Sequence, residues 1–190
     1  MNDTTITVGE ARLSYAHLFE PYAQNPGQEP KYSASVLIPK TNTKAKAQID
    51  AAIEAARQIG LQKKWNNQAP AMLNTTLYDG DGVRPNGEPF GAECRGHWVL
   101  SCNANVSHPP KIVNLARQPI VDQSEVYSGM YGWVNVNFFP YFTAGKKGIG
   151  CGLNAVMKTR DGEPLGGSAP SVDEAFAEVP QIDPITGLPM

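Results

Sequence analysis

The segment from residue 131 to residue 141 holds the most informative side chains, because aromatic and amide residues alternate there with apolar ones. In a β-strand, successive side chains point to opposite faces of the sheet. Val134, Val136 and Phe138 share one parity and suit a hydrophobic core. The other parity holds Tyr131, Trp133, Asn135, Asn137, Phe139 and Tyr141. A sealed core would leave the amides without partners, so this parity is expected to face solvent.

A hairpin-like turn is expected around residues 144–148, and a return strand from Ile149 to about Lys158 is expected to pair with the first. One parity of this segment is apolar and is formed by Ile149, Cys151, Leu153, Ala155 and Met157. The other parity is formed by Gly148, Gly150, Gly152 and Asn154. Glycine inside a strand often marks the close approach of a ligand or of another backbone.

Aromatic rings stack on unpaired bases with about 1–3 kcal/mol per base, whatever the base, while Lys and Arg attract phosphates. The two segments therefore predict a binding site for single-stranded nucleic acid, with stacking by the four aromatic residues of the solvent-facing parity. The phosphate-attracting residues are expected to be Lys146, Lys147, Lys158 and Arg160, with Arg12, Lys31, Lys111 and Arg117 as further candidates. The alternative, in which these rings are the core of a second sheet layer, remains open.

Other combinations of reactive residues give weaker patterns. Asp79 and Asp81 belong to a DGDG turn that lacks the rest of a calcium-binding loop. A metal-dependent nuclease that uses these acids is kept as an alternative function. Cys94, His97 and Cys102 match no standard zinc spacing. The expectation is a protein without catalytic residues, metal or cofactor.

Length and composition fit one domain with a tail. The chain has 190 residues, of which 41% are hydrophobic and 18% are charged, and its formal net charge is -2. This apolar fraction is enough for a core. The three cysteines, an odd number, argue against a disulfide framework. With no secretion signal at the start, a cytoplasmic location is expected, in the host cell if a phage encodes the protein.

The charges are segregated along the chain. Residues 1–160 contain all 16 Lys and Arg against 12 acids, whereas residues 161–190 contain six acids and no base. Residues 168–190 show no periodic pattern and are expected to be a flexible acidic tail. Such a tail can compete with a nucleic acid for the basic groups, or dock on replication or recombination proteins through its alternating acidic and apolar end.

The remaining segments predict a mainly β domain over residues 1–167. Strands are expected at 4–8, 11–19, 32–38 and 98–104, and an amphipathic helix at 43–60, with an N-cap among residues 41–43 and Gly60 just past its end. Residues 66–96 are expected to form a long loop excursion. These elements favour an OB-like β-barrel with one main helix.

Several blocks resemble a family of bacteriophage single-stranded-DNA-binding proteins, once known only as a domain of unknown function. The matching blocks are residues 29–33 (EPKYS), 37–40 (LIPK), 123–129 (QSEVYSG), 148–154 (GIGCGLN) and 160–167 (RDGEPLGG). The resemblance covers roughly residues 5–167. It implies an OB-like fold and binding of single-stranded DNA without strong sequence preference, in phage replication or recombination. A third function, a virion or assembly protein with an aromatic protein interface, and the possibility of a homo-oligomer stay open.

Overall fold

The computed structural model describes residues 3–166, 177, 179–180 and 182–188. The strands are β1 (Thr5–Tyr22), β2 (Lys31–Pro39), β3 (Leu77–Asp79), β4 (His97–Asn105), β5 (Lys111–Val113), β6 (Tyr131–Thr143) and β7 (Lys146–Arg160). The helix is α1 (Thr43–Lys63), and two short 3-10 turns span Ala92–Cys94 and Gln123–Glu125. The predicted tail falls largely outside the described residues. Within those residues, no helix is long and apolar enough to span a membrane.

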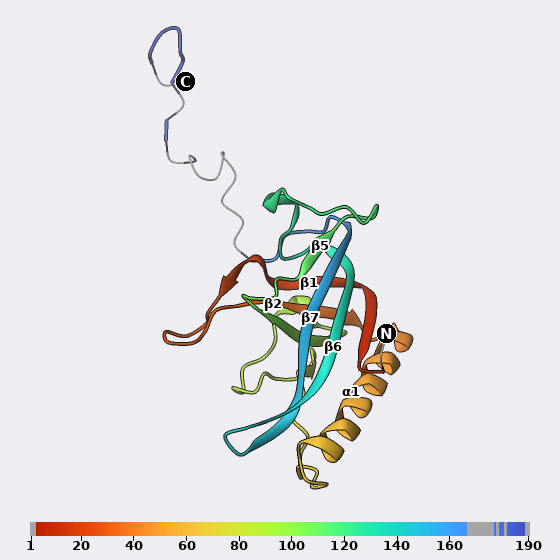
Figure 1. Cartoon of the computed structure of the whole chain (residues 1–190). Coiled ribbons are helices and arrows are strands. Elements are labelled where there is room, and N and C mark those ends of the chain that lie inside the picture. Colours follow the sequence, from red (N-terminus) through yellow and green to blue (C-terminus); the bar gives the residue numbers. More distant parts are fainter. Residues whose placement is uncertain (1–2, 167–176, 178, 181, 189–190) are drawn as a thin grey trace.

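Five of the strands close into a barrel (Figure 1). β1 pairs with β2, β2 with β4, β7 with β6, and β6 with β1, all antiparallel. A parallel contact between β4 and β7 closes the ring, while β3 and β5 extend its margins. This order is that of an OB-type barrel, with α1 inserted between β2 and β4. The predicted fold class, an OB-like barrel with one main helix and long loop excursions, is therefore confirmed.

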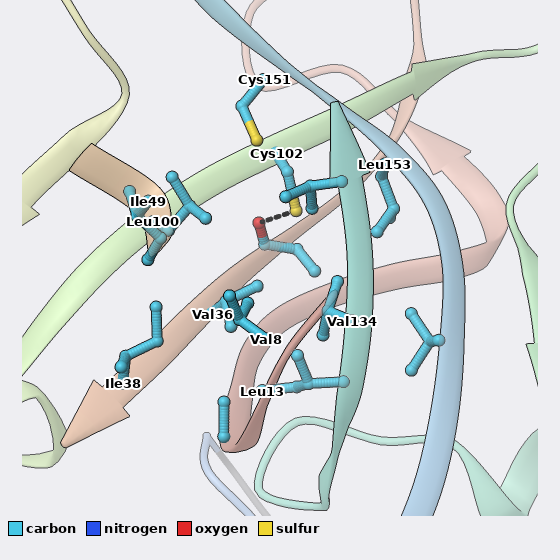
Figure 2. Close-up of a cluster of buried hydrophobic side chains, with 14 of the residues drawn as sticks. Val8, Leu13, Val36, Ile38, Ile49, Leu100, Cys102, Val134, Cys151 and Leu153 are labelled. Carbon is cyan, nitrogen blue, oxygen red and sulfur yellow. Dashed lines mark hydrogen bonds between the residues drawn. The ribbon is translucent and has the colours of Figure 1, made fainter. Parts of the chain in front are cut away.

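The barrel interior contains the apolar parities of its strands. Val134, Val136 and Phe138 on β6 are buried, as the alternation predicts. On β7, Leu153 and Cys151 are buried beside Cys102 of β4 (Figure 2). These side chains fill the interior of the closed barrel and are shielded there from water.

The predicted parity of β7 is wrong beyond residue 154. Asn135 of β6 pairs with Ala155, but the next residue, Val136, pairs with Leu153, so β7 holds one extra residue at Asn154. A bulge of this kind moves every later side chain to the opposite face. Val156 is consequently fully buried, whereas Ala155 is only partly buried.

Helix α1 begins as predicted but ends later. The Asn42 side chain caps it by accepting a hydrogen bond from the Ala45 N–H at 3.1 Å. Gly60, predicted to lie just past the end, is a buried helical residue, and the helix continues to Lys63. The ring of Trp65 lies over Gly60, where a Cβ atom would come within 2.8 Å of it. The glycine is required by this packing and not by a left-handed backbone.

The first two predicted strands form one long strand, β1, instead of two separated by Gly9. The ladder with β6 passes from the pair Val8–Val134 to the pair Ala11–Gly132 through an irregularity. Gly9 therefore interrupts the register without ending the strand. The predicted loop excursion contains β3 and a 3-10 turn and packs Tyr78 and Phe90 against a small buried cluster on the outside of the barrel.

Candidate nucleic-acid interface

The outer face of β6 presents two exposed rings. Trp133 is 42% exposed and Phe139 is 41% exposed, while Tyr131 and Tyr141 on the same parity are half-buried. The predicted alternation of burial along this strand is confirmed. Trp133 and Phe139 are six residues apart, which is about 20 Å along a strand, so no single group of the size of a base can contact both rings.

Each exposed ring packs on a glycine of a neighbouring strand. A Cβ atom at Gly9 of β1 would meet the Trp133 ring at 2.7 Å, and one at Gly150 of β7 would come within 3 Å of the Phe139 ring. Gly148 lies against Tyr141 in the same way. The glycines of β7 therefore make room for side chains of β6. The rings are held against the backbone, with their outer sides available for stacking.

The predicted amides form a polar row between these rings. Asn135 donates a hydrogen bond from Nδ2 to Thr7 Oγ1 at 2.8 Å. Its Oδ1 accepts one from Asn154 Nδ2, also at 2.8 Å. Asn137 lies against Gly152 on β7. The amides on this face are thus linked across three strands, which fixes their orientation.

Three of the predicted basic residues are already paired within the protein. Lys158 contacts Asp161 at 2.6 Å, and Arg160 contacts Glu10 at 2.8 Å. Arg12 donates hydrogen bonds to two backbone carbonyls, those of Gly129 and Glu163. The pKa of Glu10 lies below its usual value, because Thr159 and Arg160 donate hydrogen bonds to its carboxylate.

These contacts gather cations around Tyr131. The guanidinium carbon of Arg160 lies 3.6 Å from the centre of the Tyr131 ring, and that of Arg12 lies 5.7 Å from it. Tyr131 is therefore a cation–π partner of two arginines rather than an open ring like Trp133.

The remaining predicted cations are distributed over the barrel. Lys146 is exposed at the β6–β7 turn, and Lys147 beside it donates a hydrogen bond to the Gln68 carbonyl. Lys31 lies at the start of β2. Lys111 and Arg117 are exposed on and beside β5, outside the groove described next.

A groove of about 780 Å³ runs over the outer surface of β1, β2 and β4. Its aromatic residues include Tyr15 and Tyr22, which are 55% and 52% exposed. The Tyr22 ring stacks on His17 with ring centres 4.4 Å apart. Lys31 also lines the groove. The β1–β2 connection and the β6–β7 turn project toward the same side of the barrel in Figure 1.

Arg84 places a positive charge between two rings of this groove. Its guanidinium carbon lies 5.7 Å from the ring centre of Tyr15 and 5.3 Å from that of Phe90. It also donates a hydrogen bond to the Tyr15 hydroxyl at 3.3 Å. Rings and cations interleaved in this way are the arrangement that binds single strands.

The groove and the β6 face are joined through β7. Asn103 lines the groove and pairs with Gly152 across the parallel contact of β4 and β7. Gly152 in turn lies against Asn137 of β6. The two aromatic surfaces are therefore parts of one band that follows the barrel wall.

The family model for the ssDNA-binding protein of Enterobacter phage Enc34 matches residues 4–184. The chain belongs to this family. A relative from Acyrthosiphon pisum secondary endosymbiont phage 1, described as putative protein p50, is 32% identical over 181 residues, covering 89% of this chain and 91% of the relative. The family resemblance of the sequence blocks is thereby confirmed.

Solved structures of the Enc34 family have the same fold. The single-stranded DNA-binding protein from bacteriophage Enc34 in complex with ssDNA matches with a TM-score of 0.71 and 31% identity, over 87% of this chain and 91% of that one. The gp2.5 single-stranded DNA-binding protein of bacteriophage T7 matches with a TM-score of 0.56 and 16% identity, over 93% and 94% of the two chains. At this identity, the T7 protein is evidence of the fold alone.

The groove was not predicted from the sequence, because Tyr15, one of its exposed rings, lies on the face opposite to the expected one. Strict alternation along β1 places Tyr15 with Ala11 and Leu13, which are buried. Tyr15 instead has a φ of 47°, and the β1–β2 register shifts between Ser14 and His17. The irregularity turns Tyr15 outward. The aromatic content of residues 15–22 was the one available signal.

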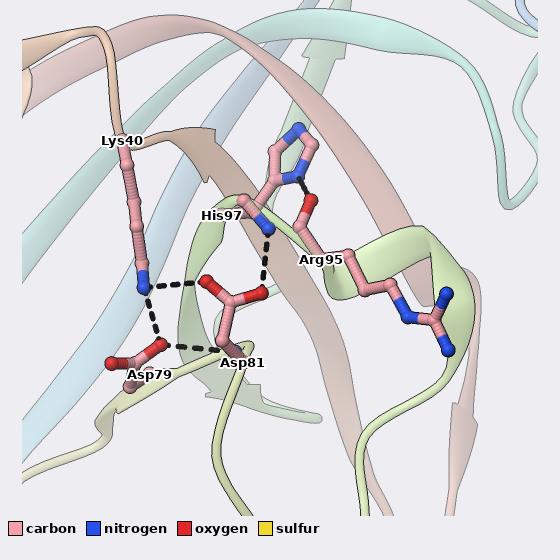
Figure 3. A network of polar contacts seen from close by, with 6 residues as sticks. Lys40, Asp79, Asp81, Arg95 and His97 are labelled. Carbon is pink, nitrogen blue, oxygen red and sulfur yellow. Dashed lines mark hydrogen bonds and ion pairs between the residues drawn. The ribbon is translucent and has the colours of Figure 1, made fainter.

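Asp79 and Asp81, the two acids considered for a nuclease, both form ion pairs with a lysine. Lys40 Nζ lies 2.6 Å from Asp79 Oδ1 and 2.7 Å from Asp81 Oδ2 (Figure 3). Asp81 also accepts a hydrogen bond from the Gly96 N–H at 2.9 Å. In this Enc34-family barrel, the pair ties the end of β2 to the loop between β3 and β4. Within the described ranges, no group of three or more His, Cys, Asp or Glu residues could hold a metal ion.

Proposed function

We propose that this chain binds single-stranded DNA without strong sequence preference and coats it during phage replication or recombination. The groove over β1, β2 and β4 carries the proposal, because it combines exposed rings, interleaved cations and a volume of about 780 Å³. The ssDNA complex of the Enc34 protein, which is 31% identical, supports the choice of ligand.

Within the groove, Tyr15, Tyr22 and Phe90 stack on bases. Arg84 and Lys31 attract the phosphates between these bases. Stacking accepts every base because each has a π-face, which explains why the site needs no base-specific hydrogen bonds.

The bound DNA then follows the band across β7 to β6, where Trp133 and Phe139 provide two further stacking surfaces. Asn135 and Asn137 lie between them and offer polar contacts. Lys146 and Lys147 lie at the hairpin turn that joins the same two strands and attract the phosphates there. Arg160, Lys158 and Arg12 act mainly by holding this face in place, since Arg160 and Lys158 form ion pairs with acids and Arg12 donates hydrogen bonds to backbone carbonyls.

The acidic tail has a regulatory role in this proposal. Its carboxylates compete with DNA for the cations of the groove and also mediate docking on replication or recombination proteins. The protein acts in the host cytoplasm, where phage DNA is replicated, and DNA binding involves no catalysis by the chain.

The test is a titration of tryptophan fluorescence with oligo-dT at several salt concentrations. Binding is expected to quench the fluorescence and to weaken with salt, because phosphate contacts release counterions. Trp133→Ala, which lacks the reporting ring, is measured instead by the anisotropy of a dye-labelled oligo-dT, and it is expected to lose about 1–3 kcal/mol of binding free energy if the ring stacks on a base. Trp65 is 1% exposed and serves as the buried, unresponsive fluorophore.

Three results would change the assignment. Unchanged affinity in folded Trp133→Ala and Phe139→Ala, with loss in Tyr15→Ala, would confine the DNA to the groove. Absence of binding by the wild-type chain at low salt would overturn the function. Magnesium-dependent loss of the labelled oligonucleotide, abolished by Asp81→Ala, would favour the nuclease instead.

A further inference from the structure

A second pocket lies on the outside of the barrel, where residues 106–121 pack against β1 and β2. We call this segment, which includes β5, the β5 arm. The pocket has a volume of about 240 Å³. Its lining is apolar apart from one tyrosine hydroxyl and consists of Leu18, Phe19, Tyr32, Pro109, Pro110, Ile112, Pro119 and Ile120. Such a lining suits an aliphatic side chain and not a phosphate or a base edge.

The surface of the β5 arm is also unusually apolar. Val106, Leu115 and Val121 are 45%, 65% and 86% exposed. Exposed apolar residues that gather beside a pocket mark an interaction site. These three residues belong to the same segment as more than half of the pocket lining, although none of them lines the pocket itself.

Two cations accompany this apolar surface. Lys111 lies within β5 next to Pro110, and Arg117 lies two residues before Pro119. Both are exposed, and neither forms an ion pair with an acid in the part of the chain that the structure describes. The expected occupant is therefore a peptide that combines aliphatic side chains with acids.

The C-terminal segment of the chain has this chemistry. Ile182, Ile185 and Leu188 are 60%, 92% and 65% exposed. They surround Asp183, whose backbone closes a turn by hydrogen bonds with Gly187 and Leu188. The turn presents the Ile185 side chain outward beside a carboxylate.

We propose that residues 182–188 dock on the β5 arm of the same molecule, with Ile185 in the arm pocket and Asp183 near Lys111 and Arg117. Burial of an exposed isoleucine drives this contact, and the acid and the two cations orient it. The proposal concerns a site separate from the DNA-binding band and does not depend on DNA binding.

The length of the intervening chain permits docking within one molecule. Residues 167–181 separate the last described residue of the body from the segment. Fifteen residues span at most about 50 Å when extended, which exceeds the size of a small barrel. A covalent connection of this length gives an effective concentration of the order of millimolar, so that even a weak contact is populated.

The test is paramagnetic relaxation in the full-length chain without DNA. A spin label is attached to Thr186→Cys, and methyl signals of Leu18, Ile112 and Ile120 are followed. The three native cysteines are at most 4% exposed, and burial raises the pKa of the Cys94 thiol, so the introduced cysteine is the reactive one. Docking predicts selective broadening of the methyl signals of the arm pocket.

A second variant separates apolar docking from simple charge attraction. Ile185→Asp, added to the labelled chain, removes the apolar side chain and adds an acid. Docking in the arm pocket predicts that the broadening is lost, whereas attraction by charge alone predicts that it persists or grows. Val121→Glu in the arm, at an exposed position, is expected to weaken the broadening as well.

Three results would overturn the proposal. They are the absence of broadening at the arm pocket, broadening that Ile185→Asp leaves unchanged, and broadening that persists when spin-labelled chains without isotope are mixed with isotope-labelled chains without a spin label. The last result would place the segment on a second copy. Because no DNA is present, each result leaves the proposed function standing.

Discussion

The ring of Phe139 packs against the backbone of Gly150 on the neighbouring strand, at a distance that leaves no room for a Cβ atom. Gly150 is paired directly with Phe139 across β6 and β7. The glycine therefore determines how the ring lies, and the ring covers a stretch of β7 backbone that would otherwise face water. A residue without a side chain controls the geometry of a candidate stacking surface.

Gly150→Ala is expected to displace the Phe139 ring and weaken oligo-dT binding several-fold. The new methyl group would lie within 3 Å of two ring carbons. Since the ring can swing outward, the free energy of unfolding should fall by only about 1 kcal/mol, at the low end for overpacking. Fluorescence titration gives the affinity, and urea denaturation gives the stability.

A double-mutant cycle with Phe139→Ala serves as the control for Gly150→Ala. If the glycine acts through the ring, Gly150→Ala has little further effect on affinity once the ring is absent. An equal loss of affinity in both backgrounds would show that position 150 contacts DNA by itself.

Arg84→Gln is expected to reduce the salt dependence of oligo-dT binding. Each phosphate contact with a single strand contributes about 0.7 to the slope of log affinity against log salt concentration. Loss of one contact should lower the slope by about this amount, in addition to weakening the binding at low salt. Lys63→Gln, at an exposed position on α1, is the matched control and should leave the slope unchanged.

Lys40→Met is expected to destabilise the protein most near neutral pH. Hydrogen bonds from Lys40 hold the pKa values of Asp79 and Asp81 below their usual range. The stability from a depressed carboxyl pKa is present above the unfolded value, near pH 4, and is lost as pH falls through the folded value. Because the pKa of Lys40 is raised, the stabilisation by these ion pairs is lost at alkaline pH only above about pH 10.

Urea denaturation of wild type and Lys40→Met from pH 2 to pH 8 checks this expectation. The difference in the free energy of unfolding should shrink as the pH falls below about 4. A constant difference would mean that the lysine acts through its contact with the Trp98 ring, whose centre lies 4.9 Å from Nζ. Lys44→Met, at an exposed position in the first turn of α1, is the control.

Removal of residues 168–190 is expected to tighten ssDNA binding, most strongly at low salt. The deletion removes Asp173, Glu174, Glu178 and Asp183. In the proposed function, these acids compete with phosphates for the groove cations. Screening limits this competition, because the Debye length is only about 10 Å at 0.1 M salt. The measurement is the affinity for oligo-dT at two salt concentrations.

A full-length chain with these four acids changed to Asn and Gln separates charge from length. It should reproduce the tighter binding of the deletion. Weaker binding after the deletion would contradict competition and would assign the tail a direct contribution to DNA binding.

Local patterns were sufficient for the strands with regular register. Alternation along residues 131–141 correctly places Val134 inside and Trp133 outside. The capping residue Asn42 and the start of α1 also follow from local chemistry. These features depend only on neighbouring residues, because the periods of strands and helices are properties of the backbone.

Irregular positions could not be predicted in this way. One extra residue at Asn154 reverses the face of Ala155 and Val156, and the turn of the backbone at Tyr15 moves its ring from the expected inner side to the groove. A prediction from strict alternation assigns the residues that follow such an irregularity to the wrong face of the strand. Gly60 was interpreted as a helix end for the same reason, since its contact with Trp65 is tertiary.

By itself, the sequence determined the class of barrel, the aromatic face of β6, the segregation of acids into the tail and the family resemblance. These follow from residue types, from short-range periodicity and from the matching blocks. Only the tertiary structure decided that Arg160 is paired with Glu10, that Lys40 forms ion pairs with both Asp79 and Asp81, and that Arg84 lies between Tyr15 and Phe90. These partners are far apart in the chain, and closure of the barrel brings them together.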